Sequence, residues 1–292
     1  MPNKNQFFLI VACLFCTYFF WGSTYLAIKF AIESFPPFLM VCVRFTIAGL
    51  LLYIVMRLLG APNPTLVEWR NSAMIGFLLP VLGNGTVTHV QQTVSSSVAA
   101  LSIATAPIWM AIFSSLWGHK IIKREWLGVA IGFVGIMLLN LRGSLQEDWL
   151  SALLLMFAAA SWSFGSVWSK HLQLPKGLIG AACQMLCGGL IAFVFSIFAG
   201  EGWPEEISAR SWGAMIFMIF LGSMVTYSAF QWLLKNVRPL VASSNTFVNP
   251  IVAFIMGVMF ADETIHAAEY LALAVILVGV FLVLSTNSKE EI

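Results

Sequence analysis

The stretch from Phe7 to Ile32 reads FFLIVACLFCTYFFWGSTYLAIKFAI, and Lys29 is its single charged residue. About 20 apolar residues in an α-helix cross a hydrocarbon core about 30 Å thick, so this stretch predicts a membrane-spanning helix. It is too long for the apolar core of a signal peptide and has no small-x-small cleavage site. We therefore expect it to remain in the protein as a first span.

The rest of the chain has the same character. Of its 292 residues, 60% are hydrophobic and 10% are charged, whereas soluble domains carry about 25% charged residues. Composition therefore excludes a soluble enzyme and predicts an all-α polytopic membrane protein. Apolar runs bounded by charges, prolines and glycines predict ten spans joined by short connections. The spans cover approximately residues 7–32, 37–58, 69–92, 95–117, 125–141, 149–170, 176–199, 211–234, 239–260 and 267–286.

The fifteen basic residues are unevenly distributed about these spans. With the N-terminus inside, eleven of them lie on the cytoplasmic side, Arg142 and Arg210 lie outside, and Lys29 and Arg44 lie within the bilayer. Because cytoplasmic loops are enriched in Lys and Arg, we expect a multi-pass protein of the inner (cytoplasmic) membrane with both termini in the cytoplasm. None of the thirteen Asp and Glu residues falls near the middle of a predicted span.

The two halves of the sequence repeat each other. A single offset of 143 residues relates several matched positions, which indicates a duplication. The repeats are residues 1–143 and 144–292, within one integral membrane unit. Five spans per half is an odd number, so the second half enters the membrane from the opposite side and a 5+5 inverted-topology repeat is expected. The matched positions include Gly22-Ser23 with Gly165-Ser166, Val98-Ala99 with Val241-Ala242, and Pro107 with Pro250.

Short motifs follow one another along the whole chain. They include Trp21-Gly22-Ser23-Thr24-Tyr25, Ala104-Thr105-Ala106-Pro107, Glu125-Trp126-Leu127-Gly128, Val248-Asn249-Pro250 and Glu263-Thr264. In their order and spacing these motifs resemble the drug/metabolite transporter superfamily, specifically its EamA-type ten-helix members and the YedA-like group among them. The resemblance implies a central cavity lined by spans 1, 3, 4, 6, 8 and 9, with spans 5 and 10 at the periphery. It also implies export of small metabolites or drugs.

Polar residues recur on one face of several predicted spans. Asn84, Thr88 and Gln91 follow an i, i+4, i+7 pattern, and Tyr227 and Gln231 repeat the i, i+4 part in span 8. A lipid-facing polar group is costly, so these faces predict a common substrate cavity. Interhelical hydrogen bonds and aromatic packing are the alternative for each single residue. The predicted cavity residues are Trp21, Ser23, Asn84, Thr88, His89, Gln91, Gln92, Ser102, Trp109, Trp162, Ser166, Tyr227, Gln231, Asn245 and Asn249.

Two basic residues and two prolines also lie within the predicted spans. Lys29 has Glu33 one turn further on, which favours a structural ion pair or a side chain that reaches the interface. Arg44 has no such neighbour on its helix, so it is either functional or bonded to carbonyls or to Glu33. Pro107 and Pro250 each remove a helical hydrogen bond, and they predict either hinges or fixed kinks.

The sequence contains no phosphate-binding glycine loop and no metal-ligand cluster, so no cofactor, metal or ATP-driven step is expected. A net charge of +2 gives no reason to expect a nucleic-acid partner. The expected partners are the lipid bilayer and a small-molecule substrate, with a monomer favoured and a homodimer left open. We expect a secondary transporter that exports small amphipathic metabolites such as amino acids by alternating access. Multidrug efflux is the alternative, and a membrane-embedded enzyme is disfavoured because His89 has no carboxylate near it in sequence.

Overall fold

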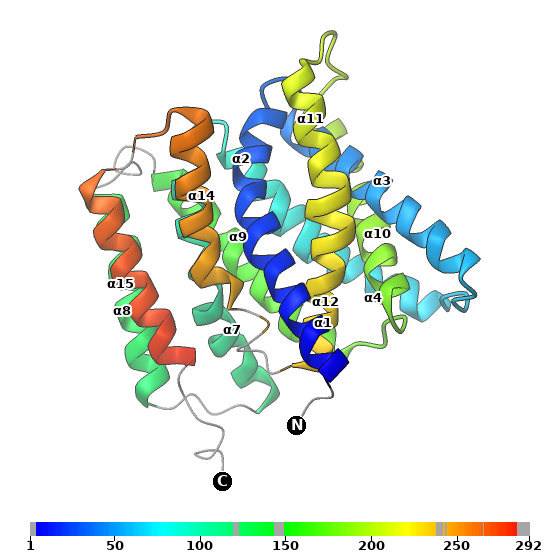
Figure 1. The fold of residues 1–292 in the computed structure, drawn as a ribbon, viewed down its shortest axis with the longest axis horizontal. Helices are drawn as coiled ribbons and strands as arrows, with labels where there is room; N and C mark the ends of the chain where they lie inside the picture. The colour runs from blue at the N-terminus through cyan, green and yellow to red at the C-terminus, as the bar shows by residue number, and fades with distance from the viewer. Residues whose placement is uncertain are drawn as a thin grey trace.

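The computed structural model describes residues 4–118, 123–142, 149–237, 242, 244–264 and 266–284, and its regular structure in these ranges is entirely helical (Figure 1). The predicted all-α class is therefore confirmed. The helices are α1 (Lys4–Phe15), η1 (Cys16–Phe20), α2 (Trp21–Ala31), α3 (Pro37–Leu58), α4 (Leu66–Gly76), η2 (Phe77–Gly85), α5 (Thr86–Val90), α6 (Ser96–Ile103), α7 (Ala106–Ser114), η3 (Ser115–Trp117), α8 (Lys123–Arg142), α9 (Trp149–Trp168), η4 (Ser169–His171), α10 (Leu178–Phe198), α11 (Ala209–Phe217), η5 (Met218–Val225), α12 (Thr226–Asn236), α14 (Asn245–Ala261) and α15 (Ala267–Leu284).

Many of these helices join end to end into longer rods. Within the described ranges, seven rods are long and apolar enough to cross a membrane. Three shorter apolar helices, Trp126–Gly135, Val248–Ala261 and Ala267–Gly279, lie where the fifth, ninth and tenth spans are predicted. Helix α1 begins and α15 ends at the same end of the bundle, which we name the terminal end; the opposite end is the distal end (Figure 1).

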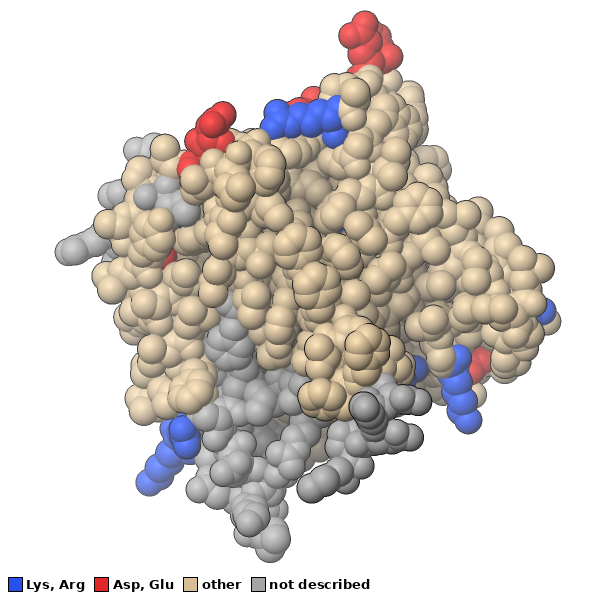
Figure 2. All heavy atoms as spheres, viewed as in Figure 1, with Lys and Arg blue, Asp and Glu red and all other residues tan. Residues whose placement is uncertain are grey.

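The outer surface suits a lipid environment. On α10, Leu190, Phe193 and Ile197 are exposed, while Cys183, Met185 and Ala192 are buried against the rest of the bundle. On the face shown in Figure 2, charged side chains gather mostly at the two ends of the molecule and leave an almost uncharged belt between them. The hydrophobic surface of such a belt is shielded from water when lipid surrounds it.

Helices from the two halves pack against each other in pairs. Helix α3 lies along α10, and α8 lies along α15 at the edge of the bundle (Figure 1). Glycine allows close approach in the second pair, because a Cβ on Gly279 would lie 2.7 Å from the Gly128 carbonyl oxygen and 2.7 Å from the Gly132 nitrogen. Small residues at helix interfaces let backbones approach in this way and increase van der Waals contact.

The fourth rod is broken beside Pro107. Helix α6 ends at Ile103, and α7 begins at Ala106, so Pro107 lies in the first turn of α7. A proline there leaves no hydrogen bond unmade, because the first amides of a helix have no partner in it. The expectation of a mid-helix proline is therefore wrong for Pro107, whereas Pro250 does lie inside α14.

Candidate functional site

Six segments converge on a central cavity. They are α2, η2 with α5, α6 with α7, α9, α12 and α14, and the cavity has an empty volume of about 750 Å³, including the part that opens to solvent. These are the six spans that the family resemblance implies, and among the described residues neither α8 nor α15 contributes to the lining.

One wall of the cavity is aromatic. The Trp21 and Trp162 rings meet edge to face with centroids 5.4 Å apart, and Phe230 lies 5.0 Å from Trp21 and 5.8 Å from Trp162. The Trp21 indole is also fixed by a hydrogen bond, because its Nε1 donates to the Gly222 carbonyl at 3.0 Å. Rings held in this way offer a preorganised surface for an apolar or flat group.

The polar part of the lining consists mainly of amides. Asn249 is satisfied when its nitrogen donates to the carbonyl oxygens of Thr17 and Tyr18, at 3.0 and 3.1 Å, and its oxygen then accepts from Asn245 Nδ2 at 3.2 Å. Both carbonyls belong to the π-helical turn η1. Asn245 Oδ1 is buried and has no hydrogen-bond partner within the described ranges. A buried acceptor without a partner is costly, so this atom is a candidate to receive a donor from a ligand.

Five of the fifteen predicted cavity residues line the cavity, and several others bond within their own helix. The hydroxyls of Ser23, Thr88, Ser102 and Ser166 each donate to the carbonyl four residues earlier, at distances between 2.8 and 3.0 Å. None of these four residues is among those that line the cavity, and back-bonding occupies the hydrogen of each hydroxyl. The five residues that do line the cavity are Trp21, Asn84, Trp162, Asn245 and Asn249.

The predicted polar face of span 8 contacts α10 instead of the cavity. Tyr227 Oη and Gln231 Nε2 both donate to Gln184 Oε1, at 2.7 and 2.8 Å, and both side chains are buried. Neither Tyr227 nor Gln231 lines the cavity in this conformation. The i, i+4 spacing does place Tyr227 and Gln231 on one face of α12, but the Gln184 side chain on α10 accepts the hydrogen bonds of both.

The remaining predicted cavity residues also lie away from the cavity. Gln91 Nε2 donates to the Tyr25 carbonyl at 2.9 Å, and Trp109 packs against other aromatic rings with its Nε1 unpartnered within the described ranges. His89 and Gln92 are neighbours at the distal end, where both line a separate, shallow hollow. Neither residue lines the central cavity, because helical periodicity predicts the face of a helix but not the position along its axis.

Sequence reasoning missed several lining residues. Thr24 and Tyr25 follow Trp21 along α2, Met110 lies on α7, Phe230 precedes Gln231, and Thr246 follows Asn245. Thr24 and Tyr25 stand inside the quoted WGSTY motif, which was the available signal for them. Met110 and Phe230 are apolar, so no polar pattern could have selected them.

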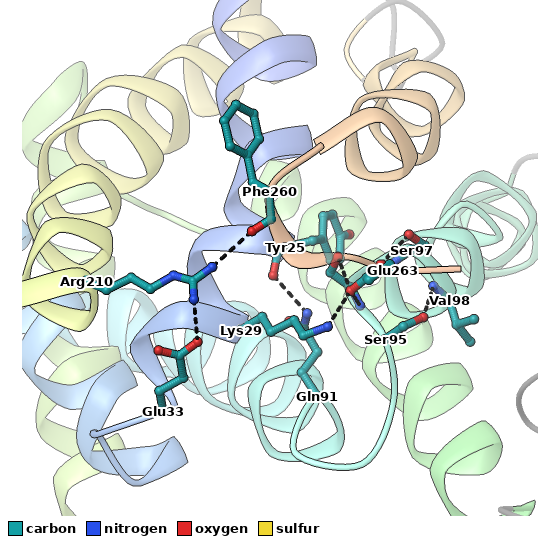
Figure 3. Close-up of polar contacts among 11 residues, drawn as sticks. Tyr25, Lys29, Glu33, Gln91, Ser95, Ser97, Val98, Arg210, Phe260 and Glu263 are labelled. Atoms are coloured by element: carbon teal, nitrogen blue, oxygen red, sulfur yellow. Dashed lines mark hydrogen bonds and ion pairs between the residues drawn. The ribbon is translucent and has the colours of Figure 1, made fainter. Parts of the chain in front are cut away.

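A buried carboxylate holds the distal end of the cavity region together (Figure 3). Glu263 accepts from Lys29 Nζ at 2.9 Å, from Ser96 N and Oγ at 2.9 and 2.8 Å, and from Ser97 N and Oγ at 3.2 and 2.6 Å. We call Lys29, Ser96, Ser97 and Glu263 the Glu263 cluster. Its members belong to α2, to the first turn of α6 and to the loop after α14, so the cluster joins three segments whose helices line the cavity.

The expected pairing of Lys29 with Glu33 is wrong. Lys29 pairs with Glu263, and Glu33 instead meets Arg210 Nη1 at 3.5 Å, while Arg210 Nη2 donates to the Phe260 carbonyl at 2.9 Å (Figure 3). Lys29 and Glu33 are one helical turn apart, but better partners from α11 and the loop after α14 lie closer. Two ionic contacts thus connect the distal ends of α2, α11 and α14.

The hydrogen bonds shift the acidity of Glu263. Burial by itself raises the pKa of this carboxyl, but hydrogen bonds from Ser97, Lys29 and Ser96 outweigh burial and lower the pKa below its ordinary value of 4.5. These donors favour the charged form, in which the carboxylate accepts all five contacts. The carboxyl is therefore ionised at neutral pH.

Arg44 is buried in the interior, as its place in span 2 suggests. Its side chain contacts Ser223, Asn84, Gly222 and Met218, and the guanidinium lies 4.7 Å from the centroid of the Phe45 ring. The sequence left open a functional role, bonding to carbonyls or bonding to Glu33. In the structure Nη2 approaches the Gly222 oxygen at 3.5 Å and Glu33 pairs with Arg210, so Glu33 is not the partner of Arg44.

Apolar helices that converge on a partly polar central cavity are typical of an integral membrane transport protein. The comparisons with known proteins agree with this class. The chain belongs to the EamA-like transporter family, which matches residues 8–141 and 149–285. It is thus a multi-pass membrane transporter of the drug/metabolite transporter superfamily, as the motifs suggest.

Named relatives and a solved structure show the same likeness. The Escherichia coli (strain K12) protein named "Uncharacterized inner membrane transporter YedA" is 39% identical, over 96% of this chain and 92% of its own length. The Bacillus subtilis (strain 168) protein named "Uncharacterized transporter YvbV" is 26% identical, over 93% of this chain and 90% of its own length. A crystal structure with 18% identity has the same fold, with a TM-score of 0.67 over 97% of this chain and 98% of that one.

Proposed function

We propose that the protein is an inner-membrane exporter of small amphipathic metabolites such as amino acids. The observation that carries this proposal is the composition of the cavity, where an aromatic wall formed by Trp21, Trp162 and Phe230 stands with the amides of Asn84 and Asn245. Such a site suits a ligand with one apolar part and one hydrogen-bonding part. The inner-membrane location is supported by the name of the relative YedA, an inner membrane transporter, and by the excess of basic residues predicted on the cytoplasmic side.

The topology belongs to the same proposal. We place ten spans in two inverted repeats, residues 1–143 and 144–292, with both termini in the cytoplasm. Two observations support it: α3 and α8 pack against α10 and α15, their counterparts in the second half, and α1 begins at the end where α15 finishes (Figure 1). We also propose a monomer, because the glycine-rich face of α8 is occupied by α15 of the same chain.

The Glu263 cluster is the proposed distal gate of alternating access. It connects α2, α6 and the end of α14, so these segments cannot separate at the distal end while the cluster is intact. Opening of the cavity toward that side would break the Lys29 contact where α2 moves away, and the four serine contacts where the loop after α14 leaves α6. We propose that the conformation described here is the one closed at the distal end.

Flux measurements test the proposed function. Purified protein in proteoliposomes should exchange radiolabelled members of an amino-acid panel faster than protein-free liposomes do, and Trp162→Ala should slow the exchange. Absence of flux for every member, with the protein folded, would overturn the amino-acid version. A cationic dye in the same assay separates multidrug efflux, which is disfavoured because the residues that line the cavity include no carboxylate to attract a cation.

A further inference from the structure

A buried positive charge lies directly behind the cavity wall. Arg44 is 1% exposed, and its Nε donates to Ser223 Oγ at 2.8 Å. Its other contacts are longer: Nη2 to the Gly222 oxygen at 3.5 Å, Nη1 to Asn84 Oδ1 at 3.5 Å and Nη1 to Met218 Sδ at 3.7 Å. No carboxylate pairs with Arg44 in the part of the chain that the structure describes, so the guanidinium is surrounded by neutral groups.

A bracing role between helices does not explain this charge. Joining α3 to η5 needs a hydrogen-bond donor, and a neutral amide would supply one without the cost of burying a cation. An ionised side chain within a bilayer is expensive unless a counterion or a polar cavity compensates it, and a guanidinium stays protonated under all ordinary conditions. A transient anion in the cavity would supply the missing counterion.

Asn84 connects this charge to the cavity. Its Oδ1 faces Arg44, so its Nδ2 is the end of the amide that remains for a ligand, and Asn84 is a lining residue. The lining residues include neither an acid nor a base, so no nearby charge cancels the field of Arg44 inside the cavity. The polarised amide and the positive potential both favour an oxyanion.

We infer that the cavity selects substrates that carry a carboxylate, and that Arg44 sets this preference through Asn84. The inference deepens the proposed function and rests on it. Arg44 is a positioning residue, because it acts through the amide and does not reach the cavity itself. Two unit charges about 8 Å apart, at an effective dielectric constant of about 20, attract strongly enough to change an equilibrium constant by roughly thirtyfold.

Binding of a matched pair of probes tests the inference without requiring transport. Phenylacetate and phenylacetamide have nearly the same shape, and only the first is charged at pH 7. We expect the purified protein in lipid nanodiscs to bind radiolabelled phenylacetate about tenfold or more tightly than the amide. Arg44→Gln should abolish this preference, and Arg44→Lys should retain part of it because the charge remains.

A second variant covers the case in which Arg44→Gln fails to fold. Asn84→Asp places a carboxylate beside the guanidinium, where the pair stabilises the fold but neutralises the charge, so the preference for phenylacetate should disappear. Ser211→Ala is the control: it removes a buried hydrogen bond to the Phe30 oxygen, which lies outside the cavity lining, and should leave the preference unchanged.

The outcomes separate the two proposals. Equal binding of both probes by the native protein, or a preference that survives Asn84→Asp, would overturn the role of Arg44 and leave the transporter proposal standing. Equal losses for both probes in Arg44→Gln would mean that Arg44 only braces the helices. Failure of the folded native protein to bind either probe would overturn the inference and count against the amphipathic cavity as well.

Discussion

Replacement of Glu263 by glutamine is the perturbation that most directly tests the proposed gate. The substitution keeps the size of the side chain and removes its charge. The two carboxylate oxygens accept five hydrogen bonds in the native protein, three at Oε1 and two at Oε2. An amide retains one acceptor oxygen and turns an NH₂ group toward donors, so the Ser97 N–H loses its partner in the closed state.

The magnitude follows from burial. The Glu263 side chain is 3% exposed and that of Lys29 is 34% exposed, so the pair is buried on one side only. Removing one partner of a fully buried pair costs about 3 to 5 kcal/mol, and the exposure of Lys29 places this case near the lower limit, at about 3 kcal/mol. Because about 1.4 kcal/mol corresponds to a factor of ten, the closed state should lose roughly a hundredfold in population relative to the open state.

Distance measurements between spin labels provide the assay. Glu205→Cys and Met259→Cys, in a cysteine-free background, place labels at exposed positions in the loop after α10 and near the distal end of α14. We expect one predominant distance in the native protein and a substantially populated, longer distance in Glu263→Gln. Substrate affinity measured from the distal side should rise with the open population.

Glu33→Gln is the matched control, since it removes an acid at the same end of the molecule. The Glu33 and Arg210 side chains are 42% and 51% exposed, and a surface ion pair contributes about 0 to 1 kcal/mol. The distances should therefore barely change. Equal shifts in both variants, or a lower unfolding temperature in Glu263→Gln without a second distance, would refute the gate and leave Glu263 as a structural residue.

Three further outcomes are expected. Because the pKa of Glu263 is lowered in the folded protein, the contribution of its charge to stability is present above pH 4.5 and is lost as pH falls through the lowered value. The difference in unfolding temperature between the native protein and Glu263→Gln should therefore vanish over the same fall in pH. Gly279→Ala should destabilise the α8–α15 pair by about 1 to 3 kcal/mol, seen in thermal unfolding, because its Cβ would press on backbone atoms; unchanged stability would contradict the close packing. Trp162→Ala should weaken phenylacetate binding about tenfold, whereas Trp109→Ala, outside the cavity, should not; equal losses would argue against the aromatic wall.

Much of the fold could be predicted because membrane helices are set by local composition. A run of about 20 apolar residues has few alternatives to a helix in a bilayer, since every backbone group must be bonded within it. The break before Pro107 could not be predicted in the same way. A proline interrupts a helix or begins one according to its neighbours. Pro107 and Pro250 occupy matching positions in the two repeats, so the sequence could not tell that Pro107 begins a helix whereas Pro250 lies inside one.

The site was harder to predict, and the reason differs by residue type. A serine or threonine hydroxyl can satisfy itself on its own helix, as Ser102 does at Val98, so its presence in a span says little about a cavity. A glutamine reaches a neighbouring helix, as Gln231 reaches Gln184.

The asparagines of the prediction lie differently from these hydroxyls and glutamines. All three asparagines in the prediction, Asn84, Asn245 and Asn249, line the cavity. Two carbonyls that accept from Asn249, those of Thr17 and Tyr18, belong to the π-helical turn η1, which no sequence pattern predicted. The polar environment of Asn249 thus depends on irregular backbone, which hydropathy and helical periodicity do not reveal.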